Sequence, residues 1–343
     1  MPIINDPHFD PNKAFPMTSP WAWEYYIKGI ANNWVPEEVR MEQDIMQWKS
    51  KNILSQQERK LILLNLGFFS TAESLTANNL IKVVSNHITD FQCQQYLIRQ
   101  IWEEAIHTHT FIYCCNSFLE SKEIDEVYKM YKTIPSVKEK DDFVIELTKS
   151  VSDPNFSTQG EKGIRLFLHD LIGYYVIMEG IFFYAGFAMM LNLKRNGKME
   201  GVGKQFEFIL RDESLHVGFG CDLINIIKKE NPRVWTPEFQ KEIIKLIKKA
   251  VDLEKKYACE ACPEEILGIR PQQFCQYVEY IANRRLEQIG LSKMYFDEKG
   301  KEINNPFDWM STAIDLKKEQ NFFEGTVKEY QHASSLKWDE EDE

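Results

Sequence analysis

A glutamate followed three residues later by a histidine occurs twice in this sequence, and the repetition constrains the fold strongly. The first pair is Glu104 with His107, and the second is Glu213 with His216. On an α-helix this spacing places both side chains on one face, about one turn apart. A carboxylate and an imidazole presented together can bind a transition metal. One such pair arises easily by chance, but two in largely apolar helical surroundings predict a metal site between helices.

Two further glutamates complete a repeated pattern. Glu73 lies in the predicted helix before Glu104, and Glu179 lies in the predicted helix before Glu213. Four carboxylates and two histidines on four facing helices are typical of the di-metal site of a ferritin-like bundle. Two divalent cations would neutralise these acids, which would otherwise repel one another in an apolar core.

Helical periodicity of apolar residues extends along most of the chain, and no stretch alternates with period two for long enough to predict a sheet. The predicted fold class is therefore all-α, with a di-metal carboxylate core and additional helices. Ser55 has the position of an N-cap. The predicted helices are 21–33, 36–49, 56–87, 90–119, 122–133, 137–151, 163–194, 203–230, 237–262 and 271–290. A turn-like Asp-Glu-Lys-Gly run at 297–300 allows a small hairpin over 294–303.

Length and composition favour one large domain. The chain has 343 residues with only 16 glycines and 13 prolines, and no linker-like stretch interrupts its middle. We expect an irregular N-terminal arm over 1–20, a ferritin-like di-metal domain over 21–320 and a flexible acidic tail over 321–343. The tail ends in Asp339-Glu340-Glu341-Asp342-Glu343, and such a run of acids does not pack into a core.

Charge and cysteine usage exclude several classes of function. A net charge of −11 argues against nucleic acid, which proteins bind through clustered Lys and Arg. Seven cysteines without a signal-peptide pattern favour a reducing cytoplasm. The stretch from Leu171 to Asn192 is long enough to span a bilayer, but it carries Glu179 near its centre. No second comparable stretch exists, so we interpret it as a buried core helix and expect no membrane.

Several neighbours of the predicted ligands have candidate roles. Asp212 can orient a histidine through its ring N–H, and Trp34 can extend such a chain through its indole N–H. Gly180 weakens its helix and can permit a bulge beside the metals. His109 lies two residues from His107 and therefore on another face, so we expect a packing or surface histidine.

Phe183 and Ile209 lie one helical turn from Glu179 and Glu213, respectively. At these positions they would line a dry pocket beside the metals, which suits oxygen activation. Ordinary core packing explains both residues equally well, and the sequence does not separate the two interpretations.

The blocks around these residues resemble the small, radical-generating subunit of class I ribonucleotide reductase, over nearly the whole length from Trp21 to the tail. The blocks that carry the resemblance are Ala31-Asn32-Asn33-Trp34, Phe68-Phe69-Ser70-Thr71-Ala72-Glu73, Glu103-Glu104-Ala105-Ile106-His107, Met178-Glu179-Gly180 and Arg211-Asp212-Glu213. The resemblance implies one metal held by Glu73, Glu104 and His107, and another held by Glu179, Glu213 and His216. In that arrangement Glu104 and Glu213 bridge the two metals.

The resemblance also implies a radical route and a partner. The route runs through His107, Asp212 and Trp34 inside the subunit. Tyr330 in the C-terminal tail would relay it to the large subunit, where ribonucleotides are reduced to deoxyribonucleotides. Activation of O2 at the metals and a homodimer are further expectations from the family.

Two departures from the commonest family pattern indicate a subclass. Most members hold a stable radical on a tyrosine four residues after the first histidine, whereas this chain has Phe111 there. Phenylalanine has no O–H to lose, so the oxidising equivalent must stay on the metals. Most members also have an aspartate in place of Glu73. Both changes resemble the subclass called Ic, which uses a manganese–iron pair.

The sequence leaves the metals and the electron route open. Two irons or two manganese ions remain alternatives, since both metals accept carboxylate and imidazole ligands. Some Ic members have a tyrosine where this chain has Phe208, which leaves Trp34 as the candidate for electron delivery.

Other functions of the same fold are open at this stage. A ferritin-like ligand-binding Mn/Fe oxidase also lacks the radical tyrosine, but a free-standing oxidase has no need for Tyr330 in an acidic tail. Iron storage predicts a much shorter chain and a cage assembly. A membrane-bound di-iron oxidase is disfavoured by the single apolar stretch.

Overall fold

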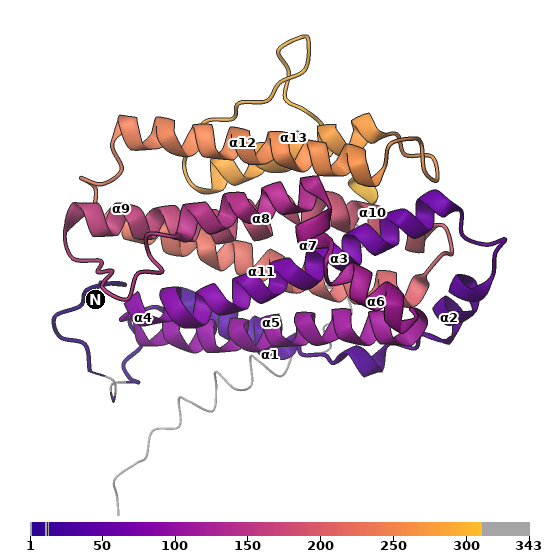
Figure 1. Cartoon of the computed structure of the whole chain (residues 1–343). Helices are drawn as coiled ribbons and strands as arrows, with labels where there is room; N and C mark the ends of the chain where they lie inside the picture. Colours follow the sequence, from indigo (N-terminus) through magenta and orange to yellow (C-terminus); the bar gives the residue numbers. More distant parts are fainter. Residues whose placement is uncertain (1, 11, 13, 311–343) are drawn as a thin grey trace, which may run out of the picture. The chain divides into compact units, whose positions relative to one another are not determined.

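The computed structural model describes residues 2–10, 12 and 14–310, and it divides the chain after Pro306 (Figure 1). The account below concerns the unit Met1–Pro306, because only residues 307–310 of the second unit, Phe307–Glu343, are described. The predicted tail over 321–343 and Tyr330 lie outside the described residues.

The described chain is all-α, as predicted, and its only β-type pairings are isolated bridges. The helical elements are α1 (Pro20–Ala31), η1 (Pro36–Glu38), α2 (Glu42–Lys49), α3 (Gln56–Asn79), η2 (Leu80–Val84), α4 (Ser85–His87), α5 (Phe91–Phe118), α6 (Ser121–Val127), α7 (Met130–Thr133), α8 (Pro135–Thr148), α9 (Gly160–Leu171), η3 (Ile172–Phe182), α10 (Tyr184–Arg195), α11 (Glu200–Glu230), α12 (Pro237–Ala261) and α13 (Pro271–Gln288).

Side-chain caps begin three of the long helices. The Ser55 hydroxyl accepts the Glu58 N–H at 3.2 Å, and the Glu58 carboxylate accepts the Ser55 N–H at 2.8 Å, which is a capping box at the start of α3. Asp90 accepts a backbone N–H at 2.9 Å at the start of α5, and Thr236 does so at 3.3 Å at the start of α12. These caps fix where the helices begin and hence which residues face the core.

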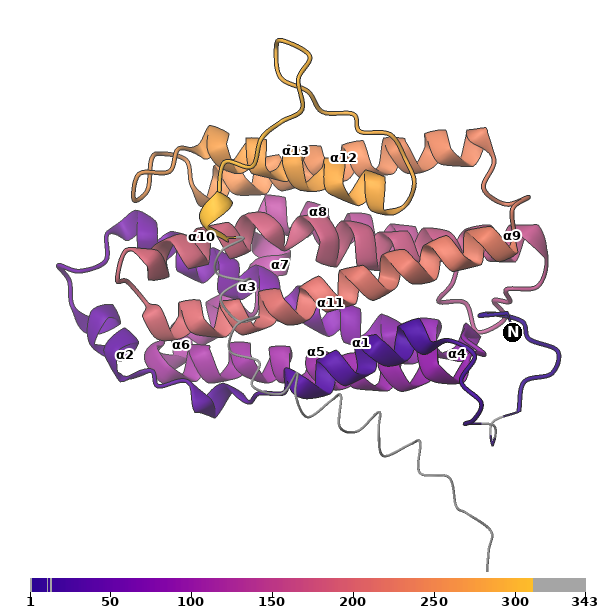
Figure 2. The same cartoon turned by 180° about the vertical axis from the view of Figure 1, so that it is seen from behind.

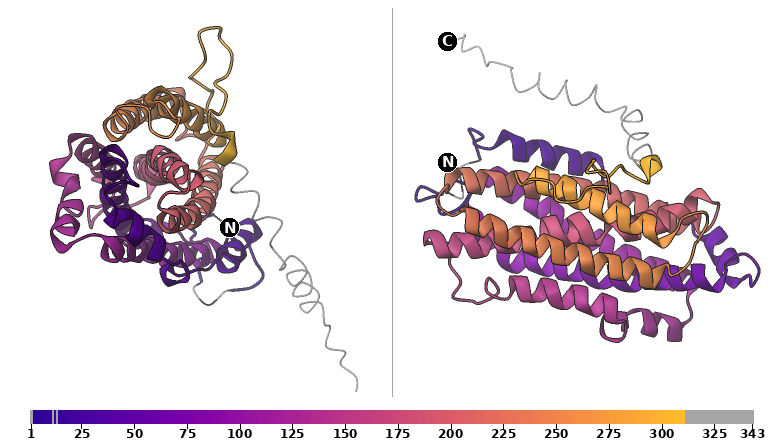
Figure 3. Two further views of the ribbon diagram at one scale, coloured as in Figure 1. Left: turned by 90° about the vertical axis from the view of Figure 1, so that its right-hand side faces the viewer. Right: turned by 90° about the horizontal axis from the view of Figure 1, so that it is seen from above.

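Four long helical segments form the core of the bundle. The contacts pair α3 with α5, and α11 with η3 and α10, while α5 also contacts α11. Helices α12 and α13 pack on η3 and α10, and α1 packs on α5 (Figures 1 and 2). Viewed end-on, the segment 160–195 lies among the other helices (Figure 3). The ferritin-like arrangement therefore presents four helices to one interior.

The apolar segment Gly160–Arg195 is long and apolar enough to cross a membrane, yet its most apolar window is wholly buried inside the bundle. The interpretation of this stretch as a core helix is confirmed. Its middle part, η3, is a π-helical segment, so the possible irregularity beside Glu179 is also confirmed. A Cβ on Gly180 would come within 2.8 Å of the Tyr175 carbonyl oxygen, so only glycine fits there.

Two predicted helices were wrong in detail, and the possible hairpin is reduced to one antiparallel bridge. The helix predicted over 36–49 is interrupted, because Val39 has extended backbone (φ −101°, ψ 120°) between η1 and α2. The helix predicted over 122–133 is two short helices, α6 and α7. The hairpin over 294–303 is a single bridge between Phe296 and Glu302 and contains no strand.

Candidate metal centre

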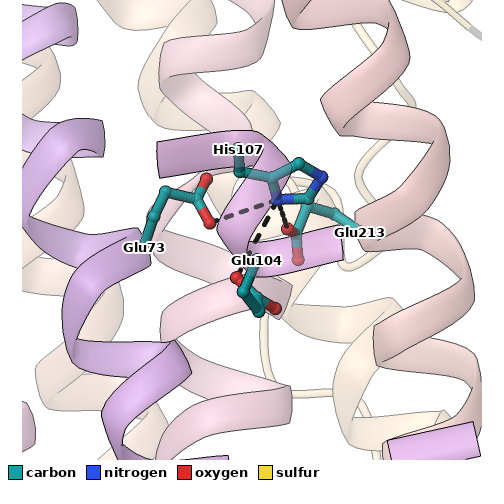
Figure 4. A group of neighbouring side chains, drawn as sticks. All are labelled: Glu73, Glu104, His107 and Glu213. Atoms are coloured by element: carbon teal, nitrogen blue, oxygen red, sulfur yellow. Dashed lines mark hydrogen bonds and ion pairs between the residues drawn. The ribbon is translucent and has the colours of Figure 1, made fainter. Parts of the chain in front are cut away.

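The first Glu-x-x-His pair meets two glutamates from neighbouring helices (Figure 4). His107 Nδ1 lies 3.1 Å from Glu213 Oε1, 3.3 Å from Glu73 Oε2 and 3.9 Å from Glu104 Oε2. These residues come from α3, α5 and α11, and all are buried. One ligand atom of each lies within 4.8 Å of those of the other three, so together they form a potential metal site.

The second pair forms an equivalent group with Glu179. His216 Nδ1 lies 3.2 Å from Glu104 Oε1 and 3.3 Å from Glu213 Oε2. Glu104, Glu179, Glu213 and His216 again offer ligand atoms within 4.8 Å of one another. Glu104 and Glu213 belong to both groups and therefore lie between them. The structure thus brings together all six residues that the sequence predicted as ligands.

The charge of the buried carboxylates fits a dinuclear metal centre. Glu73, Glu104, Glu179 and Glu213 are all 0% exposed. Among the described residues, Glu73 Oε1 and Glu179 Oε2 have no hydrogen-bond partner. Burial raises the pKa of Glu104 to about 7 and raises the pKa values of Glu73 and Glu179 as well. Without cations, burial disfavours the charged form of Glu73, Glu104 and Glu179, whereas two divalent ions would coordinate the unpaired oxygens and balance the charge.

Asp212 supports the first histidine from the far side of its ring. His107 Nε2 lies 3.4 Å from Asp212 Oδ2, and the Trp34 indole N–H donates to the same oxygen at 2.7 Å. Burial acts to raise the Asp212 pKa, but the hydrogen bond from His107 and the charge of Arg211 outweigh it and lower that pKa. The predicted chain of His107, Asp212 and Trp34 is therefore continuous.

Sequence reasoning missed the acid that supports the second histidine. His216 Nε2 lies 2.9 Å from Glu103 Oε2, and Arg99 donates to the other Glu103 oxygen at 2.9 Å. The signal was present, because an acid precedes the glutamate in both copies of the motif: Glu103 in one and Asp212 in the other. Each acid supports the histidine of the other helix, which is a tertiary contact that spacing alone does not reveal.

The remaining residues singled out from the sequence are either buried apolar side chains or, in the case of His109, exposed. Phe111 is fully buried, with its ring centroid 5.8 Å from that of Phe69 and 5.7 Å from that of Phe206. Phe183 and Ile209 are also fully buried. His109 is an exposed histidine 3.0 Å from Glu37, as expected for a residue off the site.

The Phe208 ring packs directly on the indole of Trp34. The two ring centroids are 4.9 Å apart with an interplanar angle of 41°. The guanidinium carbon of Arg211 lies 5.3 Å from the Phe208 ring centroid.

Comparisons with known proteins agree with this site. The family model described as ribonucleotide reductase, small chain, matches residues 11–306. The chain belongs to the ribonucleotide reductase small-chain family. It is 52% identical over 336 residues to the ribonucleoside-diphosphate reductase subunit beta of Chlamydia pneumoniae, covering 98% of this chain and 94% of that protein. It is 30% identical over 318 residues to the ribonucleoside-diphosphate reductase small subunit of Dictyostelium discoideum, covering 92% of this chain and 85% of that protein.

A solved structure supports the same assignment. The ribonucleotide reductase R2 subunit from Clostridium botulinum aligns with a TM-score of 0.82 at 26% identity, covering 92% of this chain and 94% of that one. The chain is therefore a small subunit of a class I ribonucleotide reductase, an oxidoreductase, and it works with a large subunit.

Proposed function

We propose that this small subunit stores its oxidising equivalent on a manganese–iron pair and not on a tyrosine, as in subclass Ic. Glu73, Glu104 and His107 would hold one ion, and Glu179, Glu213 and His216 the other, with Glu104 and Glu213 shared. When bound, the pair would activate O2 and store the oxidising equivalent. The protein's own residues orient the ligands, exclude water and conduct the electron hole.

The observation that carries this proposal is Phe111. It lies on α5, seven residues after Glu104, and its ring is enclosed by Phe69 and Phe206. A tyrosyl radical requires an O–H that can release a proton, and phenylalanine offers none. The aromatic enclosure also keeps water from the site, which protects a stored oxidant from quenching.

The hole would leave through the hydrogen-bonded chain on the His107 side. The Asp212 carboxylate accepts a hydrogen bond from the Trp34 indole at 2.7 Å and lies 3.4 Å from His107 Nε2. Asp212 therefore links the His107 imidazole to the indole that would carry the hole. Phe208 packs on Trp34 but has no hydroxyl, so Trp34 is the residue we assign to electron transfer. Tyr330 in the tail would continue the route to the large subunit.

We also propose a homodimer in a reducing cytoplasm. Three apolar side chains on α5, Ile98, Trp102 and Ile112, are 62%, 53% and 44% exposed, and their spacing places them on one helix face. An exposed stripe of this kind favours an interface, and a two-fold contact between copies would bury it on both sides. All seven cysteines are free thiols, which suits a reducing compartment.

Metal analysis of the full-length protein tests the metal assignment. After assembly with Mn(II), Fe(II) and O2, we expect anomalous diffraction at the two metal edges to place one manganese and one iron in each chain. The paramagnetic spectrum of active protein should contain no tyrosyl signal. Two equivalent irons in active protein, or a tyrosyl signal, would contradict the proposal.

A matched pair of histidine variants tests the ligand set. His216→Ala should lose at least one of the two ions. His109→Ala, on the same helix as His107 but facing away, should keep both. Full occupancy of both sites in His216→Ala would contradict the ligand assignment.

A further inference from the structure

Glu179 is held differently from the other candidate ligands. It lies in the π-helical segment η3, and its Oε1 accepts a hydrogen bond from Gln100 Nε2 at 3.3 Å. The other oxygen, Oε2, has no hydrogen-bond partner among the described residues. A glutamate side chain has several rotatable bonds, so in an apolar core this one contact decides where the free oxygen points.

Gln100 can hold Glu179 only with its amide in one orientation. Its NH2 group faces Glu179, and its carbonyl oxygen accepts a hydrogen bond from the Tyr175 hydroxyl at 2.9 Å. A flipped amide would point its oxygen at the carboxylate, and two acceptors repel. The Glu179 carboxylate therefore favours this amide orientation, and the Tyr175 hydroxyl stabilises it by donating to the amide oxygen.

Tyr175 is itself fixed by close packing. The side chain is 0% exposed, and a Cβ at Gly220 of α11 would come 2.0 Å from the Tyr175 ring carbon Cγ. Glycine at that position lets the ring lie directly on the α11 backbone. Residues from α5, η3 and α11 thus fix one continuous chain of Tyr175, Gln100 and Glu179.

We propose that Tyr175 is a positioning residue for the metal site, which acts through Gln100 to aim the free Glu179 oxygen at the ion bound by His216. The assignment rests on the proposed ligand set. The Tyr175 hydroxyl donates to the amide oxygen of Gln100, which is not a base at neutral pH. Among the described residues, no base is hydrogen-bonded to that hydroxyl to take the proton that a tyrosyl radical would release, so we assign it orientation and not radical storage.

Replacement of a single hydroxyl tests this proposal, with a matched control on the same side of the core. Tyr175→Phe removes the donor and keeps the ring. Tyr96→Phe is the control, because Tyr96 is equally buried and its hydroxyl has no hydrogen-bond partner among the described residues. Full-length protein is titrated with Mn(II) alone, and free Mn(II) is counted by its paramagnetic signal.

We expect Tyr175→Phe to lower the Mn(II) affinity of one of the two sites by about 10–100-fold. This is the usual effect of removing a residue that orients a metal ligand. The other ion should bind as in the parent, and Tyr96→Phe should bind both ions normally. In a Gln100→Leu background, Tyr175→Phe should have no further effect, since the contact that it supports is already lost.

The outcomes separate this proposal from the ligand assignment on which it rests. If Glu179→Ala still binds two Mn(II) ions with parental affinity, the proposed ligand set fails, and this inference fails with it. If Glu179→Ala loses one ion but Tyr175→Phe matches Tyr96→Phe, only this inference is overturned. Equal weakening of both ions in Tyr175→Phe would indicate general destabilisation and would also overturn it.

Discussion

Lys140 on α8 is completely buried outside the metal site. Its ammonium group allows a quantitative test of how this fold compensates a buried charge. Its Nζ lies 2.5 Å from Glu254 Oε2 on α12 and donates to the Phe182 carbonyl oxygen at 3.2 Å. The same atom lies 3.4 Å from the ring centroid of Phe68 and 4.0 Å from that of Tyr257. One carboxylate, one carbonyl and an aromatic cage therefore compensate a cation that has no access to water.

Lys140→Met should destabilise the protein strongly, because it leaves the Glu254 charge buried without a partner. Removing one member of a buried ion pair costs about 3–5 kcal/mol. Burial already raises the pKa of Glu254 to about 7 against the lowering effect of Lys140. Without the cation this pKa rises further, so the folded variant holds a proton that the unfolded chain releases. The loss of stability should therefore be largest at high pH and smaller near about pH 6.

Urea unfolding of the full chain, followed by circular dichroism, measures this effect. The metal concentration must be constant, since metal bound to the native state adds to the apparent stability. Lys138→Met is the control: Lys138 lies on the same helix and pairs with exposed Asp142, and such a surface pair contributes about 0.3–0.5 kcal/mol. The double variant Lys140→Met/Glu254→Gln removes both charges and should recover most of the loss.

Two results would refute the reasoning. A loss in Lys140→Met within about 1 kcal/mol of the loss in Lys138→Met would mean that the buried charge is not compensated as described. A double variant as unstable as the sum of its single variants would mean that Lys140 and Glu254 are not energetically coupled.

Two further predictions concern neighbouring features. Burial raises the pKa of Asp141 to about 7, so its contribution to stability is complete below its ordinary pKa and is lost as the pH rises towards 7. In urea unfolding, Asp141→Asn should flatten this decline of stability with pH. Asp142→Asn should not flatten it, because Asp142 is exposed. The sulfurs of Cys259 and Cys275 lie 3.7 Å apart, and Cys259 is exposed, so diamide should oxidise the two thiols to a disulfide that peptide mass spectrometry detects. A pH slope flattened equally by both Asn variants, or a Cys259 cross-link that persists in Cys275→Ser, would contradict these predictions.

The four metal-facing helices could be predicted because polar residues interrupt otherwise apolar faces at helical spacing. Glu73 and Glu179 were found in this way, as isolated acids placed in the same order in both halves of the sequence. The π-helical geometry around Glu179 was only a possibility. Glu179 is the only charged residue in the run from Ile172 to Phe182, so the run has no repeating polar positions that would reveal the change of helical period.

The contacts that support the ligands were harder to predict, because each joins residues far apart in the chain. Gln100 and Tyr175 have no sequence spacing that links them, and their hydrogen bond exists only because α5 and η3 lie together. Lys140 reads as an ordinary helix lysine until α12 places Glu254 against it. Tertiary packing, and not local pattern, decides which polar residues in a long helix become buried partners.

The two acids next to the bridging glutamates connect the halves of the site and also distinguish them. Glu103 on α5 supports His216 of α11, and Asp212 on α11 supports His107 of α5, so sliding one helix along the other would break both contacts together. Outward from the site the symmetry ends. Glu103 leads to the guanidinium of Arg99, which is not readily oxidised, whereas Asp212 leads to the indole of Trp34. Of these two acids, only Asp212 accepts a hydrogen bond from an oxidisable ring, so we place the proposed route for the electron hole on the His107 side.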